Sequence, residues 1–249
     1  MIIDFPHQIQ PLKALWKQAF GDTDAFIDGF FRTGFNPWRC RCVYVEDKPV
    51  SVVYWFDCLW QNKPVAYLYA IATDKAYRGQ GLFRQLLQNT HEYLADCGYV
   101  GAVLVPAEKD LFAMYEKLGY QNFSGKEQIT LPAQPHKISV LPLSAKDYLQ
   151  KRAAFLPAGS VCHRETAMEF AATYTSFYTA ENCLFCAAKE QDTLYFQEFF
   201  GNRELLPGLI WELGAEKGIV PLPGDAPFAL YHSLDGSNDL PAYFTMALD

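Results

Sequence analysis

The chain has 249 residues, a formal net charge of -7 and a pI of about 5.3. Hydrophobic residues make up 50% of the sequence and charged residues 20%, which is typical of a folded globular protein and not of a disordered one. Proteins that bind nucleic acids usually carry a basic face, so we expect neither DNA nor RNA as the main partner. The length suffices for one large domain or two small ones.

Membrane, metal and redox functions are also not expected. No run approaches the ~20 apolar residues that a membrane span needs, and the first residues lack the basic and apolar regions of a secretory signal. The 7 cysteines are odd in number and scattered among apolar residues, which favours reduced thiols and a cytoplasmic location. The pairs Cys40-x-Cys42 and Cys183-x-x-Cys186 lack further ligands at a spacing that would suit zinc.

The first half of the chain predicts a mixed α/β fold. Apolar periodicity, β-branched runs and turn residues indicate the elements in chain order. They are an initial strand at 1–5, helices at 11–20 and 24–32, strands at 41–46, 50–60 and 65–73, a helix from a glycine-rich turn to about residue 97, a strand at 100–105, a helix at 108–118, and strands at 120–123 and 128–131.

The glycine-rich turn reads R-G-Q-G over residues 78–81, between the strand at 65–73 and a helix with leucines on one side. The first turn of a helix has unpaired N–H groups and the positive end of the helix dipole. Glycines let a bound group approach the backbone closely, so such a turn suits a phosphate or pyrophosphate. The alternative is an ordinary strand-to-helix turn without a ligand.

Two nucleotide-binding motifs do not fit this turn. A P-loop requires G-x-x-x-x-G-K-[ST], and no Lys-Ser or Lys-Thr pair follows these glycines. A dinucleotide-binding turn requires G-x-G-x-x-G, and Arg84 occupies the position of the third glycine.

The strand, turn and helix together resemble the acyl-CoA loop of the GNAT superfamily of N-acetyltransferases, whose pattern is Arg/Gln-x-x-Gly-x-Gly/Ala. Arg78 and Gly81 match the pattern, whereas Phe83 stands where the family prefers Gly or Ala. The resemblance implies acetyl-CoA as the cosubstrate, no metal, and two strands that splay apart so that their main chain can bind the pantetheine arm and the acetyl carbonyl. The cofactor-binding residues it implies are Ile71, Ala72, Thr73, Arg78, Gly79, Gln80, Gly81, Leu82 and Phe83.

A second GNAT signature follows at the spacing that the family shows. Residues 115–120 read Y-E-K-L-G-Y, which is similar to the common Tyr-Glu-Lys-Leu-Gly-Phe. The resemblance implies that Tyr115 is catalytic and protonates the departing thiolate, a role that suits a phenol because its ordinary pKa of about 10 keeps it protonated. A purely structural tyrosine is the alternative. Glu108 stands where many relatives have an Asn that contacts the pantetheine.

Charged residues near the turn suit the phosphates of CoA, namely Lys75, Arg78 and Arg84. The acidic remainder of the chain mildly favours a cationic acceptor such as an amine. His91, on the helix after the turn, is expected to be solvated.

The resemblance covers the chain to about residue 131, and the Pro-containing stretch 132–136 predicts a domain boundary. We therefore expect a GNAT domain at 1–134 and a second domain at 135–249. The second half predicts strands at 138–141, 183–188, 194–200, 219–222, 229–232 and 243–248, with helices at 145–155, 164–178 and 204–217. This order echoes the first half without a second acyl-CoA loop, as in tandem GNAT proteins such as the enhanced-intracellular-survival type. An unrelated α+β cap domain is the alternative.

The function we expect is an acetyl-CoA-dependent N-acetyltransferase that acts on a primary amine of a small molecule or peptide. Alternatives are the transfer of another acyl group, and a non-catalytic module that binds CoA or a partner. The base that deprotonates the amine is left open among water and four side chains or termini: Asp57, Tyr67, Glu108 and the chain-end carboxylate of Asp249.

Overall fold

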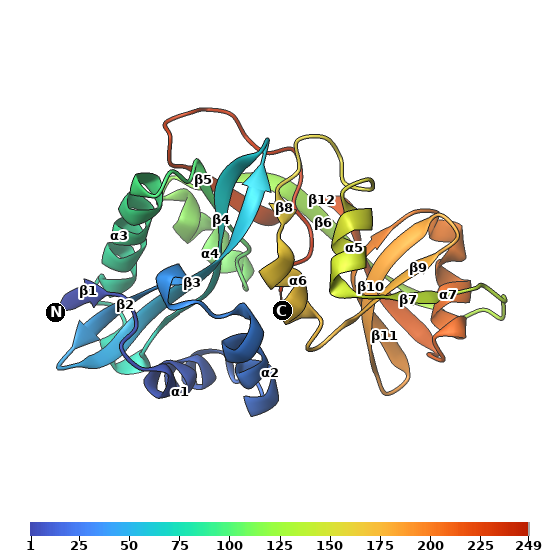
Figure 1. Ribbon diagram of the computed structural model, residues 1–249, viewed down its shortest axis with the longest axis horizontal. Coiled ribbons are helices and arrows are strands. Elements are labelled where there is room, and N and C mark those ends of the chain that lie inside the picture. The colour runs from blue at the N-terminus through green and yellow to red at the C-terminus, as the bar shows by residue number, and fades with distance from the viewer. Residues whose placement is uncertain (249) are drawn as a thin grey trace. The chain divides into compact units, whose positions relative to one another are not determined.

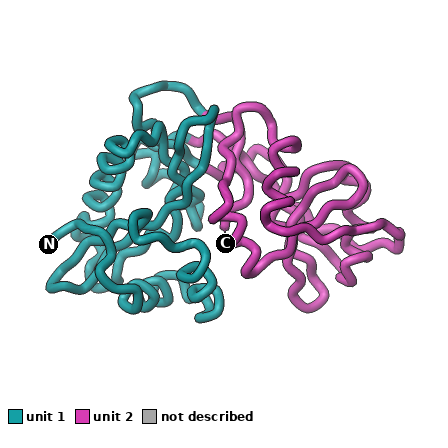
Figure 2. The backbone as a smooth tube through the Cα atoms, viewed as in Figure 1, with its two compact units in different colours: residues 1–121, 230–240 teal, residues 122–229, 241–249 magenta. Residues whose placement is uncertain are grey.

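The computed structural model describes residues 1–248, so Asp249 lies outside the described residues. The chain forms two compact units (Figure 2). Unit 1 comprises residues 1–121 and 230–240, and unit 2 comprises residues 122–229 and the segment from Pro241 onward. This division differs from the predicted domains 1–134 and 135–249, because the chain leaves unit 1 before the Pro-containing connector, and because residues 230–240 return to unit 1.

Unit 1 is a mixed sheet in the order β1-β2-β3-β4-β5, followed by the last residues of β12 (Figure 1). Neighbouring strands from β1 to β4 are antiparallel, β4 and β5 are parallel, and Leu230–Ser233 of β12 pairs antiparallel with β5. The strands are β1 (Ile2–Asp4), β2 (Cys40–Val45), β3 (Lys48–Trp60), β4 (Lys63–Thr73), β5 (Gly101–Leu104) and β12 (Lys217–Ser233).

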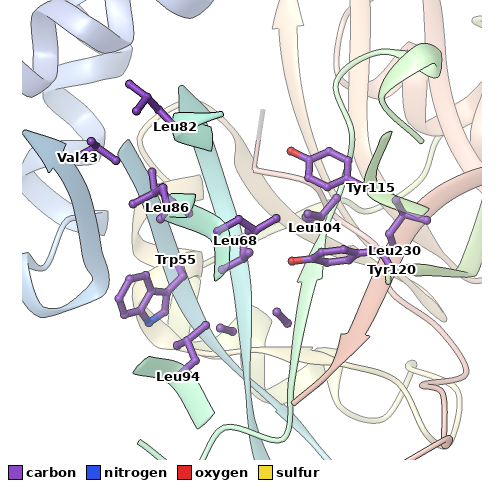
Figure 3. Packing of buried hydrophobic residues seen from close by; sticks show 14 of the residues in the cluster. Val43, Trp55, Leu68, Leu82, Leu86, Leu94, Leu104, Tyr115, Tyr120 and Leu230 are labelled. Carbon is purple, nitrogen blue, oxygen red and sulfur yellow. The ribbon is translucent and has the colours of Figure 1, made fainter. Parts of the chain in front are cut away.

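Helices cover both faces of this sheet, because successive residues of a strand point to opposite faces. Trp16 of α1 packs against the rings of Tyr54 and Tyr69 on one face. Leu86 of α3 belongs to a core with Trp55 and Leu68 on the other face (Figure 3). The helices of unit 1 are α1 (Ile9–Phe20), α2 (Asp24–Gly29), α3 (Leu82–Asp96) and α4 (Lys109–Glu116).

Unit 2 has a sheet in the order β12-β11-β10-β9-β7, and β6 also pairs with β12. Helix α7 supplies Leu206, Leu209 and Ile210 to a core with Phe185 and Phe196. The remaining elements are β6 (Gln121–Pro132), β7 (Leu141–Leu143), α5 (Ala145–Arg152), β8 (Cys162–His163), α6 (Glu165–Ala171), β9 (Ser176–Ala180), β10 (Cys183–Glu190), β11 (Thr193–Phe200) and α7 (Leu206–Glu212).

The predicted elements of the first half agree with the structure to within a few residues, with two differences. The helix predicted at 24–32 is α2 followed by a π-helical turn, Phe30–Gly34. A Cβ at Gly34 would lie 2.9 Å from the Phe30 ring and 3.1 Å from the Phe56 ring, so this turn packs its glycine against aromatic side chains. The two strands predicted near 120–131 are the single strand β6.

Predictions for the second half were less accurate. The helix predicted at 164–178 ends at Ala171, because residues from Ser176 onward pair with β7 and β10 as strand β9. The strand predicted at 138–141 begins only at Leu141. The strands predicted at 219–222 and 229–232 are one continuous strand, β12. The strand predicted at 243–248 is wrong, since this segment is irregular and is held by side chains such as Ser124, whose Oγ donates to the Phe244 carbonyl at 2.8 Å.

Candidate active site

Strands β4 and β5 are paired only at their beginnings. Residues 65–67 of β4 lie opposite residues 101–103 of β5, and within the described residues this ladder ends there although β4 continues to Thr73. The edge of β4 after Tyr67 therefore carries main-chain groups that β5 does not satisfy. Unpaired main-chain groups at a strand edge are a ready site for an extended ligand, which can add to the edge as another strand would.

A β-bulge lies within the splayed part of β4. Val52 of β3 is opposite Ala72 and Tyr54 is opposite Tyr69, so two residues of β4, Ala70 and Ile71, face one residue of β3. Ala70 has φ of 47°, a left-handed conformation that is uncommon for a residue with a side chain. A bulge turns the main chain out of the regular ladder, so Ile71 presents its peptide groups differently from its neighbours.

The other two predicted residues of this strand are back in register with β3. The Ala72 carbonyl accepts from Ser51 Oγ at 3.1 Å, and the Thr73 carbonyl accepts from Arg78 Nε at 3.1 Å. Residues 71–73 thus lie at the end of β4, next to the glycine-rich turn at 78–81. Of these residues, Ile71 is the one whose main chain lies in the bulge.

The glycine-rich turn opens directly into α3. Gly79 and Gly81 have φ of 75° and 77°, which L side chains rarely adopt. A Cβ at Gly79 would meet no described atom within 4 Å, and a Cβ at Gly81 would meet only Gln85 Nε2, at 3.9 Å. The glycines therefore face open space and are not packed against the fold. Helix α3 begins at Leu82 with no side-chain cap among the described residues, so its first N–H groups remain available to an anion.

Two residues fix the segment before these glycines. Asp74 accepts from the Ala76 N–H at 3.0 Å and from Lys48 Nζ at 2.8 Å. The Lys48 ammonium, followed by the Ala76 N–H, lowers the pKa of Asp74 below its ordinary value. The bond from Arg78 to the Thr73 carbonyl ties the turn back to the end of β4. The loop is therefore held open by its surroundings before any ligand arrives.

Tyr115 lies beside this loop. Its ring is in edge-to-face contact with Phe83, the second residue of α3, with centroids 5.8 Å apart. The side chain is 6% exposed, and burial raises the pKa of Tyr115 above its ordinary value, so the phenol keeps its proton. The contact also gives a role to Phe83, whose ring replaces the small residue of the family pattern and packs against the tyrosine.

The candidate bases differ in their surroundings. Asp57 is engaged at both oxygens, since Oδ2 lies 2.5 Å from Arg39 Nη2 and Oδ1 accepts from the Tyr99 hydroxyl at 2.6 Å. Tyr67 is buried and stacks on Phe56. Glu108 is exposed and follows the carboxyl end of β5, on the segment that leads to Tyr115. Asp249 lies outside the described residues.

His91, which was expected to be solvated and not catalytic, is half-buried and makes specific contacts. His91 Nε2 lies 2.8 Å from the Tyr120 hydroxyl, and its ring stacks on that of His232 with centroids 4.4 Å apart. Sequence reasoning missed this group because its members come from α3, the end of the second signature and β12. One signal was available, since Tyr120 stands where the signature commonly has Phe.

Membrane-spanning helices and clusters of metal ligands are absent from the described part of the chain. No helix there is long and apolar enough to cross a membrane. Within residues 1–248 no three His, Cys, Asp or Glu side chains gather as metal ligands. All seven cysteines are free, and Cys40 and Cys42 are buried with their Sγ atoms 3.8 Å apart.

Comparison with known proteins identifies the first unit. Residues 6–123 match the family model described as an acetyltransferase (GNAT) domain. This range contains the splayed strands, the glycine-rich turn and Tyr115.

Several solved structures share the fold over nearly the whole chain. A GCN5-related N-acetyltransferase from Kribbella flavida is 17% identical, with a TM-score of 0.70 over 94% of this chain and 71% of that one. Eis1 from Mycobacterium abscessus is 12% identical, with a TM-score of 0.66 over 94% of this chain and 74% of that one. A tandem GNAT protein from the clavulanic acid biosynthesis pathway is 11% identical, with a TM-score of 0.58 over 95% of this chain and all of that one (100%).

The matches with solved structures extend through both units, so the predicted mixed α/β architecture in two halves is confirmed. The family match confirms the prediction of a GNAT-type acyltransferase. Residues 6–123 of this chain form a GNAT acetyltransferase domain.

Proposed function

We propose that this protein is an acetyl-CoA-dependent N-acetyltransferase that transfers the acetyl group to a primary amine by direct attack. The observation that carries the proposal is the open glycine turn at the start of α3, joined to Tyr115 by the ring of Phe83. An anion-binding turn and a buried phenol side by side suit a cosubstrate with phosphates at one end and a thioester at the other.

The cosubstrate would bind along the loop and the splayed strand. The first N–H groups of α3, with those of residues 79–81, would take the pyrophosphate, and the exposed side chains of Lys75, Arg78 and Arg84 would add positive charge. The free edge of β4 beyond Tyr67 would pair with the amides of the pantetheine arm.

The acetyl carbonyl would lie at the bulge. A main-chain N–H that a bulge turns out of the ladder is fixed in direction, so it stabilises the oxyanion of the transition state without reorganising. Ile71 is the residue in that position. The amine nitrogen then forms a bond to the carbonyl carbon, the carbon–sulfur bond breaks, and CoA leaves as a thiolate that takes up a proton.

Tyr115 would act on the sulfur. Because burial raises its pKa above the ordinary value of about 10, and a thiol has an ordinary pKa of about 8.5, complete proton transfer to the thiolate would be uphill. This order of pKa values favours a strong hydrogen bond from the phenol to the developing charge, with the proton passing late. For the amine proton we favour water or Glu108 over Asp57, whose oxygens are already engaged.

The acceptor we propose is a small-molecule or peptide amine, favoured by the net charge of -7. The cytoplasmic location stays a prediction that rests on the scattered cysteines. The proposal is tested by release of free thiol from acetyl-CoA across a panel of aliphatic monoamines, diamines, amino acids and peptides with free N-termini.

Each outcome of this assay has a distinct meaning. Thiol release that depends on an amine, and is lost in the Tyr115→Phe variant, supports the proposal. Binding of acetyl-CoA by calorimetry without turnover of any amine would favour a binding module, and turnover only of longer acyl-CoAs would favour another acyl group. Absence of any acetyl-CoA binding would refute the proposal.

A further inference from the structure

The hydroxyl of Tyr120 is an addition to the second signature, where Phe is common. The side chain is 2% exposed, and its oxygen lies 2.8 Å from His91 Nε2. A phenylalanine would fill the same space without a polar atom. A buried hydroxyl is costly unless it is hydrogen-bonded, so this one is matched by a specific partner from α3.

His91 is held in a state that can accept this bond. Its ring stacks on His232 at 15° between planes, and His232 Nδ1 donates to the Gly119 carbonyl at 3.0 Å. Burial, with a smaller contribution from His232, lowers the pKa of His91 to about 3, so the imidazole is neutral near pH 7. A neutral imidazole nitrogen is a good acceptor for a phenol, which places the Tyr120 proton toward Nε2.

Tyr120 is tied to Tyr115 in two ways. The Tyr120 N–H donates to the Tyr115 carbonyl at 3.1 Å, and the two rings meet edge to face with centroids 5.5 Å apart (Figure 3). Gly119, with φ of 87°, allows the chain to fold back between them. A Cβ on Gly119 would also lie 3.1 Å from His232 Cε1, so a side chain there would crowd the histidine.

We propose that Tyr120, His91 and His232 are positioning residues that fix the ring of Tyr115 against the thioester. The inference rests on the proposed role of Tyr115. The ring of Tyr115 is in edge-to-face contact with both Phe83 and Tyr120. The hydrogen bond to His91 stops the Tyr120 ring from shifting, and the stacked His232 stops His91 from doing so.

A double-mutant cycle tests the proposal. Tyr120→Phe keeps the ring and removes only the hydroxyl, so acetyl-CoA affinity should be unchanged while kcat falls about two- to tenfold, the range expected for one lost hydrogen bond. In a Tyr115→Phe background the same change should alter kcat by less than about twofold, because the group being positioned is gone. A purely structural role would give the same loss in both backgrounds, and that result would overturn the proposal.

Variants of His91 give a second measurement that does not depend on the ring of Tyr120. His91→Gln keeps an acceptor near the Tyr120 hydroxyl and should retain most of kcat, whereas His91→Ala should lose as much as Tyr120→Phe. Equal kcat in His91→Gln and His91→Ala would overturn the proposal. If Tyr115→Phe alone leaves kcat intact, the role of Tyr115 fails and the network has nothing to position. Thiol release by the wild type would show whether the acetyltransferase activity itself stands.

Discussion

The two units repeat one pattern of strands and helices. In unit 1 the hairpin β3-β4 leads through α3 to the parallel strand β5, and in unit 2 the hairpin β10-β11 leads through α7 to the parallel strand β12. Each parallel ladder contains three residue pairs at the beginning of the hairpin's second strand. Each second strand also carries an extra residue where the register shifts. Unit 2 therefore fits a degenerate GNAT repeat better than an unrelated cap.

The turns after the two hairpins differ in what their glycines face. Gly79 and Gly81 of unit 1 face open space. A Cβ at Gly201 of unit 2 would lie 2.6 Å from Cys183 Sγ and 2.7 Å from the Asn182 carbonyl oxygen. Asn202 Oδ1 also accepts from the Glu204 N–H at 3.0 Å, which occupies a donor that the turn would need for an anion.

The regions beside the two bulges also differ, since one leaves its main chain unpaired and the other is filled by side chains. In unit 1 the main chain after Tyr67 is not paired with β5. In unit 2 the residue after the bulge is Glu198, whose carboxylate accepts from Arg152 Nε at 2.7 Å and from the Tyr148 hydroxyl at 2.6 Å. Side chains of unit 2 thus fill the place where unit 1 offers its backbone. The same topology therefore leaves main-chain groups unpaired in unit 1 and is filled by side chains in unit 2.

Breaking the buried ion pair between Arg152 and Glu198 in unit 2 should have the largest effect, a loss of stability. Arg152 and Glu198 are each 1% exposed, so Glu198→Gln leaves an uncompensated buried guanidinium and should lower the free energy of unfolding by about 3–5 kcal/mol. Chemical denaturation measures this loss. The double variant Arg152→Met with Glu198→Leu removes both charges and should recover most of the stability. A double variant as unstable as the single one would mean that the pair itself, and not the stranded charge, stabilises unit 2.

Removing the phenol of unit 1 should affect turnover and not folding. Tyr115→Phe keeps the ring contact with Phe83, so acetyl-CoA affinity should stay within about twofold while kcat falls about 100-fold or more, the usual contribution of an acid–base group. Assays of thiol release measure kcat, and calorimetry measures the acetyl-CoA affinity. The matched control is Tyr195→Phe in unit 2, an exposed phenol that should change neither. A kcat within twofold of wild type would make Tyr115 structural.

The sequence predicted the parts of this site that are local in the chain. The turn at 78–81 and Tyr115 lie in short motifs, and α3, β4 and β5 follow from apolar periodicity within a few residues. The bond between His91 and Tyr120 joins residues 29 apart, and His232 joins them from β12, so neither could be predicted from spacing. The first three residues of β9 were predicted as the end of a helix, but pairing with β7 and β10 overrides this local preference and makes them a strand.

Lowering the pH should destabilise unit 2, because the buried His163 is neutral in the folded protein. Burial, then the charge of Arg152, lowers the pKa of His163 from 6.5 to about 3, and its Nε2 lies 2.9 Å from the Met246 carbonyl. The unfolded chain binds the proton more tightly, so stability is complete above pH 6.5 and is lost as the pH falls toward 3. By pH 5 this histidine alone should remove about 2 kcal/mol.

The measurement is urea denaturation at pH 7 and pH 5. His163→Gln can still donate to Met246 but does not titrate, so its stability should fall less between the two pH values than that of the wild type. His136→Gln replaces an exposed histidine and serves as the control. Identical pH dependence in wild type and His163→Gln would show that His163 is not the group that acid protonates.

The smallest effect, and the sharpest contrast between the units, concerns the glycines of the two turns. Gly81→Val places a side chain where the structure has only open space, so it should block the approach of the pyrophosphate and weaken acetyl-CoA binding at least about tenfold, or about 1.4 kcal/mol. Gly201→Ala should instead destabilise unit 2, because its Cβ has no room beside Cys183, and should leave acetyl-CoA affinity unchanged. Calorimetry and thermal unfolding of both variants measure the two effects separately.

A third glycine separates strain from blockage. Gly21 ends α1 with φ of 76°, almost the angle of Gly81, and a Cβ there would also meet no described atom within 4 Å. Gly21→Val therefore carries the same cost of a left-handed side chain but lies outside the turn. Gly21→Val should lower stability as Gly81→Val does while acetyl-CoA binding stays normal. In that case the loss of affinity in Gly81→Val comes from a blocked approach of the ligand and not from backbone strain. Equal loss of binding in both variants would refute the assignment of the turn, and a second acetyl-CoA site per chain would refute the contrast between the units.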